Sequence, residues 1–177
     1  MGMPADELCA IIEQARCGSA DALGQLYDEY ASAVFALALR LLASPDEAED
    51  VVQDVFLSLP RALRSYSHRG AFLSWLRTTA ARDCIARLRR RGRRMRIRRT
   101  GLVIDRSAPP AQSETYLVIQ DAVLSLPDRY RTVFVLKVLE GYTHDEIAQL
   151  LGISVTSSRA RLSRARTTLR RLLKDRL

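Results

Sequence analysis

Hydrophobic residues recur along most of the chain at steps of three and four, the spacing of one face of an α-helix. No segment alternates apolar and polar residues for long enough to predict a β-strand. The pattern lapses around Gly101 and a pair of adjacent prolines, which lie among polar residues. We therefore predict an all-α fold with two small helical domains, residues 1–92 and 114–177, joined by a flexible linker over residues 93–113.

The clearest helix start in the first domain is the segment SPDEAEDVVQDVFLSL, which begins at Ser44. Ser44 can cap the helix, proline suits its first turn, and Glu47 stands where a capping box needs it. An apolar stripe at helical spacing then follows, made of Val51, Val52, Val55, Phe56 and Leu59, and the opposite side is acidic. Pro60 is expected to kink or end this helix, because proline has no N–H to donate.

The second domain contains the most specific pattern, GYTHDEIAQLLGISVTSSRARLSRARTTLRRLL. Thr143 and Glu146 predict a capping box for a short helix, and Gly152 supplies the turn residue after it. A longer basic helix is predicted to start just after Ser154. Its core-facing positions follow steps of three and four: Val155, Ser158, Leu162, Ala165, Leu169 and Leu172. This order predicts a helix-turn-helix whose second helix can enter the DNA major groove, with an ordinary αα-hairpin as the alternative.

Charge is distributed unevenly along the chain, whose net charge is +8. Residues 1–60 hold two arginines and eleven acidic residues, a net −9. Residues 61–100 hold fourteen arginines and one aspartate, a net +13, and the remaining residues have a net charge of +4. An acidic first part and a strongly basic middle indicate two kinds of partner, one of them rich in phosphate.

Nine of the sixteen residues from Ala86 to Gly101 are arginine, and none is acidic. Up to Arg91 the run keeps an apolar face and contains no proline or glycine, so the spacing predicts a helix from Arg77 to Arg91. From Gly92 onward we expect a basic tether. A solvated tail, a localisation signal or a general polyanion patch are the alternatives for this run.

Several classes of protein are disfavoured by the sequence. No apolar run reaches the length of a membrane span, and the N-terminus lacks the basic start of a signal peptide, so we expect a cytoplasmic protein. Cys9, Cys17 and Cys84 have no metal-ligand spacing, and buried, structural cysteines are expected. Neither a metal cluster nor a nucleophile and base at plausible spacing is evident, so we predict no cofactor, no metal and no enzymatic activity.

The helix-turn-helix, together with the upstream segments EAEDVVQDVFL and GAFLSWLRTTAARDCIARLRRR, resembles the sigma-70 family of bacterial transcription initiation factors. The short chain and the two-domain layout are similar to its extracytoplasmic-function (ECF) branch. The resemblance extends from about Leu23 to Leu173 and leaves the linker unmatched. It implies a factor that binds core RNA polymerase and directs it to a promoter with two recognition elements.

The resemblance assigns partners to the charged segments. It implies that the acidic helix binds the clamp helices of the largest polymerase subunit, through Glu49, Asp50, Gln53 and Asp54. The flap region of polymerase and an anti-sigma factor are further implied partners. The minus-10 element would be bound and melted by a loop and the helix after it: Tyr66, Ser67, His68, Arg69, Arg77, Arg82, Arg89, Arg90 and Arg91. The second domain would read the minus-35 duplex through Thr156, Ser157, Arg159, Arg161, Ser163, Arg164 and Arg166.

Some of these roles have alternatives, and the sequence departs from the family at several positions. Tyr66 offers a stacking surface for an extruded base, or else is a ring of the core. Arg82 and Ala86 stand where the family often has asparagine and aspartate, so base preference there is not carried over. Ser158 replaces a larger aliphatic residue, which predicts looser packing of the recognition helix. A stand-alone helix-turn-helix regulator, with a first domain for sensing or dimerisation, is the alternative function.

Overall fold

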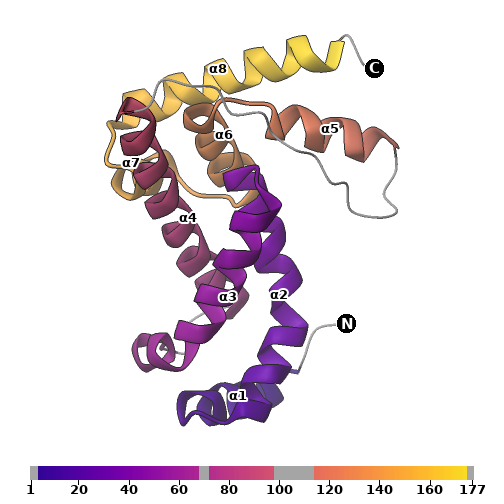
Figure 1. The fold of residues 1–177 in the computed structure, drawn as a ribbon, viewed down its shortest axis with the longest axis vertical. Helices are drawn as coiled ribbons and strands as arrows, with labels where there is room; N and C mark the ends of the chain where they lie inside the picture. Colours follow the sequence, from indigo (N-terminus) through magenta and orange to yellow (C-terminus); the bar gives the residue numbers. More distant parts are fainter. Residues whose placement is uncertain (1–3, 68–71, 98–113, 175–177) are drawn as a thin grey trace. The chain divides into compact units, whose positions relative to one another are not determined.

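The computed structural model describes residues 4–67, 72–97 and 114–174. Every regular element in these ranges is helical, which confirms the predicted all-α fold (Figure 1). The α-helices are α1 (Ala5–Arg16), α2 (Ala20–Leu42), α3 (Pro45–Ala62), α4 (Phe72–Ile97), α5 (Glu114–Leu124), α6 (Asp128–Phe134), α7 (His144–Leu151) and α8 (Val155–Lys174). A 3₁₀ turn, η1 (Leu63–Ser65), follows α3, and a π-helical turn, η2 (Val135–Leu139), follows α6.

The chain forms two compact units. The first comprises Met1–Leu39 and Pro45–Cys84, and the second comprises Arg40–Ser44 and Ile85–Leu177. The domain and linker boundaries expected from the sequence stay a prediction, since residues 98–113 lie outside the described part of the chain.

The core of the first unit is an apolar interior that includes an aromatic cluster of Tyr30, Tyr66, Phe72 and Trp75. α1 and α3 pack against each other and against η1. Leu26, Leu59 and Leu63 are at most 1% exposed, so they lie at the centre of this interior. Burying side chains of this size removes apolar surface from water, at about 1.5–3 kcal/mol for each.

α3 begins at Pro45, as the capping pattern predicted, but it does not stop at Pro60. The helix continues to Ala62, and the 3₁₀ turn η1 follows at once. A proline costs the helix one backbone hydrogen bond, because it has no N–H. Leu59 before it and Leu63 after it are fully buried, and their packing stabilises this part of the chain. Packing of these two leucines therefore outweighs the break that Pro60 was expected to cause.

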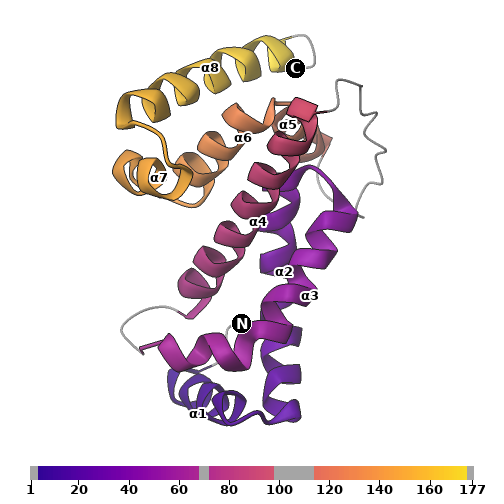
Figure 2. The ribbon, with the colours of Figure 1, turned by 60° about the vertical axis from the view of Figure 1, so that its left-hand side comes forward.

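In the second unit, α5, α6 and α7 each pack against α8. Figure 2 shows α7 and α8 side by side, joined by a short turn. Arg131 of α6 is a buried cation, only 2% exposed. It donates hydrogen bonds to the carbonyl oxygens of Leu124 at 3.3 Å and Leu126 at 2.7 Å, and to Asp128 Oδ1 at 2.6 Å. These bonds satisfy carbonyls at the end of α5 and so tie α5 to α6.

Helix α4 is longer than the sequence predicted. The expected helix from Arg77 to Arg91 is confirmed, but α4 continues through Gly92 to Ile97. A glycine costs a helix interior only about 1 kcal/mol, and the arginines that flank it are good helix formers. The predicted end at Gly92 is therefore wrong.

Candidate nucleic-acid and protein interfaces

An acidic surface covers the outer side of α3. Val51, Val52, Val55 and Leu59 of this helix are buried, which fixes its inner side. Glu49, Asp50, Gln53 and Asp54 are all exposed, as the periodicity predicted. Asp50 and Asp54 are one helical turn apart, so a basic partner can meet both carboxylates at once. We call these four residues the acidic face.

The segment after η1 contains both a core residue and an exposed one. Tyr66 is 8% exposed, with its ring 4.9 Å from that of Trp75 and 5.6 Å from that of Phe72. Its carbonyl oxygen accepts a hydrogen bond from Arg16 Nη2 at 2.9 Å. The structure therefore supports the core alternative for Tyr66 and does not present its ring as a stacking surface. Ser67 is exposed.

The other two residues expected in this loop, His68 and Arg69, lie outside the described residues. Phe72 is 2% exposed and stacks on Trp75 with ring centroids 5.7 Å apart, so Phe72 belongs to the core.

The predicted arginines of α4 differ in exposure. Arg82, Arg89 and Arg90 are exposed, whereas Arg77 and Arg91 are half-buried. Within the second unit, Arg89 Nη2 donates a hydrogen bond to the Leu150 carbonyl oxygen at 2.9 Å, and Arg91 Nη1 donates one to Leu42 at 3.3 Å. A guanidinium has five N–H donors, so Arg89 can hold the Leu150 carbonyl and still bind a phosphate through its other N–H groups.

The predicted capping box of α7 is present in full. Glu146 N–H donates to Thr143 Oγ1 at 3.2 Å, and Thr143 N–H donates to Glu146 Oε2 at 2.7 Å. The backbone and hydroxyl bonds from Thr143 lower the pKa of the Glu146 carboxyl. Gly152 then ends the helix in the left-handed conformation, at φ 64°, where a side chain would be strained.

Helix α8 begins at Val155, directly after Ser154, as predicted. Ser154 Oγ accepts a hydrogen bond from the Ser157 N–H at 3.1 Å and so caps the helix. Its buried side is Ser158, Leu162, Ala165 and Leu169. The predicted DNA-facing residues lie elsewhere on the helix: Thr156, Arg159, Ser163, Arg164 and Arg166 are exposed, and Ser157 and Arg161 are half-buried. The two helices and their turn form a helix-turn-helix.

One feature of this surface was missed by sequence reasoning. Tyr130 of α6 lies between two guanidinium groups: Arg129 stacks over its ring at 4.6 Å, and Arg164 Nη1 donates to its hydroxyl at 3.4 Å. The hydrogen bond from Arg164, followed by the nearby positive charges, lowers the pKa of Tyr130. The residues are 34 positions apart, so no local pattern in the sequence announces this cluster.

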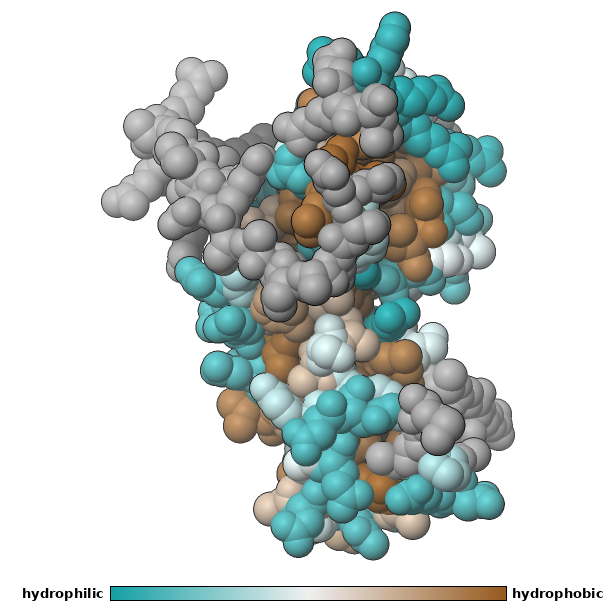
Figure 3. Space-filling view, turned by 90° about the vertical axis from the view of Figure 1, so that its right-hand side faces the viewer, coloured by the Kyte–Doolittle hydropathy of each residue, from teal (hydrophilic) through white to brown (hydrophobic). Residues whose placement is uncertain are grey.

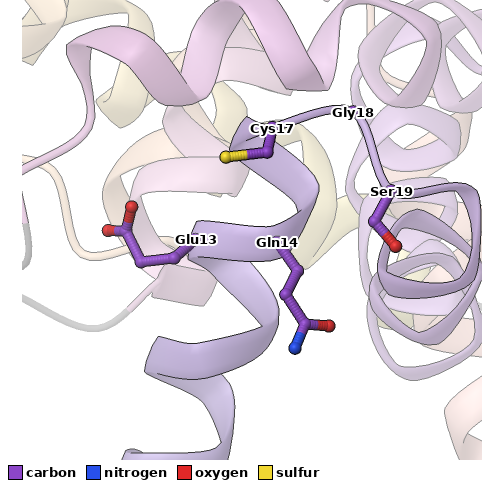
Figure 4. A pocket seen from close by; sticks show the side chains of 5 residues that line it. All are labelled: Glu13, Gln14, Cys17, Gly18 and Ser19. Carbon is purple, nitrogen blue, oxygen red and sulfur yellow. The ribbon is translucent and has the colours of Figure 1, made fainter.

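Two of the three cysteines are not where they were expected. Cys84 is buried, but Cys9 and Cys17 are exposed, and all three are free thiols. Cys17 lies with Glu13, Gln14, Gly18 and Ser19 around a pocket at the end of α1, and Figure 4 shows that their side chains do not converge. Among the residues that the structure describes, no cluster of metal ligands occurs.

Hydrophobic side chains also reach the surface. On the side drawn in Figure 3, brown hydrophobic areas are interspersed with teal hydrophilic ones. Among the described residues, the exposed large hydrophobic ones are Tyr27, Leu57, Tyr116, Leu117, Ile119, Val138 and Leu139. None of the helices in the described ranges has the length and apolar content required to cross a membrane.

Comparison with known proteins agrees with these features. Two family models match the chain, Sigma-70 region 2 over residues 26–94 and Sigma-70, region 4 over residues 116–169. The chain belongs to the sigma-70 family of RNA polymerase sigma factors, in its ECF branch. It is a transcription initiation factor that directs RNA polymerase to promoters.

Individual relatives match over most of this chain. The chain is 30% identical to the ECF RNA polymerase sigma factor SigW of Bacillus subtilis, over 93% of this chain and 95% of the relative. It is 31% identical to the ECF RNA polymerase sigma factor SigM of Mycobacterium tuberculosis, over 88% of this chain and 79% of the relative.

Solved structures are also similar. The sigma factor RpoE of Bartonella quintana, determined with the anti-sigma factor NepR, has a TM-score of 0.64 and 26% identity, over 85% of this chain and 96% of that chain. CnrH, whose structure was determined with the cytosolic domain of CnrY, has a TM-score of 0.54 and 27% identity, over 94% of this chain and 96% of that chain.

Proposed function

We propose that this sigma factor divides its tasks among three surfaces. The acidic face of α3 binds the clamp helices of the polymerase largest subunit. The segment around Ser67 and the arginines of α4 bind and help to open the minus-10 element. The outer side of α8 reads the minus-35 element as a duplex.

The observation that carries this proposal is the separation of opposite charges on different helices. The four polar residues of the acidic face are exposed on α3, while exposed arginines lie on α4 and α8. Arginines pair with phosphate oxygens, whereas a carboxylate face repels DNA and needs a basic protein partner. A stand-alone helix-turn-helix regulator has no need of that second surface, so this alternative is not favoured.

The outer residues of α8 are suited to two kinds of DNA contact. Ser157, Arg159, Ser163 and Arg164 lie in its first half, the part of a recognition helix that contacts base edges. Arg161 and Arg166 are assigned to phosphates, which position the protein without specifying sequence. The Arg129 and Tyr130 pair beside Arg164 extends this basic surface onto α6.

Regulation and location follow from the same assignment. An anti-sigma factor is expected as a further partner. The structure of RpoE of Bartonella quintana was determined with the anti-sigma factor NepR, and that of CnrH with the cytosolic domain of CnrY. The flap region of polymerase is the expected partner of the second domain. The protein is expected to act in the cytoplasm, where polymerase and promoter DNA are found.

The acidic face is tested by reversing its charge. Asp50→Lys with Asp54→Lys should weaken binding to core polymerase by several kcal/mol in total, the order measured for close charge pairs at interfaces. Asp6→Lys with Glu7→Lys, on exposed positions of α1, changes the net charge equally and serves as the matched control. Binding is measured by titrating each full-length variant with purified core enzyme. Wild-type affinity for the Asp50 and Asp54 variant would refute the assignment.

A further inference from the structure

A hydrogen bond joins the two helices of the helix-turn-helix at their starts. His144 is the first residue of α7, and its Nδ1 lies 2.9 Å from Ser158 Oγ in the first turns of α8. Ser158 is 0% exposed and is the one polar member of a stripe otherwise made of Leu162, Ala165 and Leu169. A buried hydroxyl is costly without a partner, so this bond constrains how α8 can rotate against α7.

Residues that flank Ser158 belong to the proposed DNA surface. Ser157 and Arg159 are its immediate neighbours, and Thr156 lies two positions before it. A serine in this buried position fills less space than an aliphatic residue, so packing alone defines the helix orientation less firmly. A directional hydrogen bond supplies the constraint that the missing side-chain volume does not.

We propose that the His144–Ser158 hydrogen bond is a positioning pair that sets the rotation of α8 and thereby the base pairs that its outer side chains reach. This inference rests on the proposed reading of duplex DNA by α8. Neither residue contacts DNA in this assignment. Their effect is transmitted through the orientation of Ser157, Arg159 and Arg164.

The surroundings of His144 favour a neutral imidazole. The pKa of His144 is lowered by burial, and further by the positive charges of Lys137 on η2 and of Arg159 and Arg166 on α8. The negative charge of Asp145, on its own helix, raises it. A positive charge at the first residue of α7 would also oppose the helix dipole. Because the folded pKa lies below the ordinary value, the stabilisation is complete above about pH 6.5 and is lost as the pH falls through the folded pKa.

The test compares two amides at position 144 in the full-length chain. Asparagine places its amide where Nδ1 stands and keeps the bond, whereas glutamine places it nearer Nε2 and loses the bond. Affinities are measured for a minus-35 duplex and for its single-base substitutions. His144→Gln and Ser158→Ala should each reduce the discrimination between the best and mismatched duplexes by roughly threefold to tenfold, in line with one lost hydrogen bond.

Coupling and rescue separate positioning from general stability. The His144→Gln and Ser158→Ala double variant should lose no more discrimination than either single variant, and His144→Asn should retain the wild-type ratio without its pH dependence below pH 6.5. In the intact wild-type protein, the nitrogen shifts of the His144 ring should report a neutral imidazole, and the Nδ1 shift should change in Ser158→Ala.

Two results would overturn this inference: additive losses in the double variant, or wild-type discrimination in both single variants. A wild-type protein that binds all duplexes equally would instead refute the proposed reading of the minus-35 element, and the positioning role with it.

Discussion

Arg164 of the recognition helix is held by the hydroxyl of Tyr130 on α6, with its Nη1 atom 3.4 Å from the oxygen. The bond limits the positions that an exposed guanidinium can adopt before DNA arrives. A pre-oriented side chain loses less conformational entropy when it binds. Replacing Tyr130 with phenylalanine removes the hydroxyl and keeps the ring under Arg129.

Tyr130→Phe should therefore weaken binding to a minus-35 duplex by roughly twofold to tenfold, the range expected for one hydrogen bond. Fluorescence anisotropy with a labelled duplex measures this loss. Thermal unfolding should be unchanged, because the hydroxyl is held by a surface arginine. Equal affinity of the two proteins would show that Arg164 needs no such orientation.

Arg164 and Arg166 should respond differently to truncation. Arg164→Ala should cost about 1–3 kcal/mol of binding free energy and relax the preference at one or two base pairs. Arg166→Ala should weaken binding to all sequences alike and lower the salt dependence. Binding to a set of single-base variants of the duplex distinguishes the two. Losses that ignore sequence in both variants would mean that the base-reading and phosphate-binding sides are assigned wrongly.

The capping box should contribute measurably to the stability of the helix-turn-helix. Thr143→Ala leaves the start of α7 without its side-chain acceptor and should reduce the free energy of unfolding by about 1 kcal/mol. Thr143→Ser keeps a hydroxyl acceptor and should therefore retain most of the wild-type stability. Urea unfolding measures both. Because the pKa of Glu146 is lowered in the folded state, its contribution is present above about pH 4.5 and is lost as the pH falls through the folded pKa. Thr143→Ala should reduce that part of the acid sensitivity without abolishing it, because the backbone N–H of residue 143 can still donate to the Glu146 carboxylate.

The arginines before Gly92 should act on DNA opening more than on polymerase binding. Replacing Arg89, Arg90 and Arg91 with alanine removes three cations from α4 and should reduce open-complex formation and its salt sensitivity. Permanganate footprinting measures the melted bases, and core binding should stay at the wild-type level as the control. Unchanged melting at every salt concentration would return these arginines to the role of a solvated charge run.

Local chemistry explains which features the sequence predicted well. Thr143, Glu146 and Gly152 interact with residues a few positions away, so their pattern determined both ends of α7 in advance. The apolar stripes of α3 and α8 likewise fixed which sides are buried. These predictions depend on spacing alone, and spacing is visible in a sequence.

Features that depend on distant residues were missed or predicted wrongly. Tyr66 was assigned a possible stacking role because its burial by Phe72 and Trp75 depends on tertiary packing. The buried Arg131 also donates hydrogen bonds to the Leu41 carbonyl oxygen, 90 positions away, and no local pattern announces that partner. Ser158 was expected only to loosen the packing, since its partner His144 lies fourteen positions away on another helix.

Run-off transcription tests the central claim, that this chain directs core RNA polymerase to promoters. Purified core enzyme is incubated with the full-length protein and a library of DNA with randomised promoter positions, and the transcripts are sequenced. Transcripts should appear only with the protein present and should share two upstream elements, and the yield should fall with Asp50→Lys and Asp54→Lys but not with Asp6→Lys and Glu7→Lys. Transcription that is independent of the protein, or that starts without a shared upstream element, would contradict the claim.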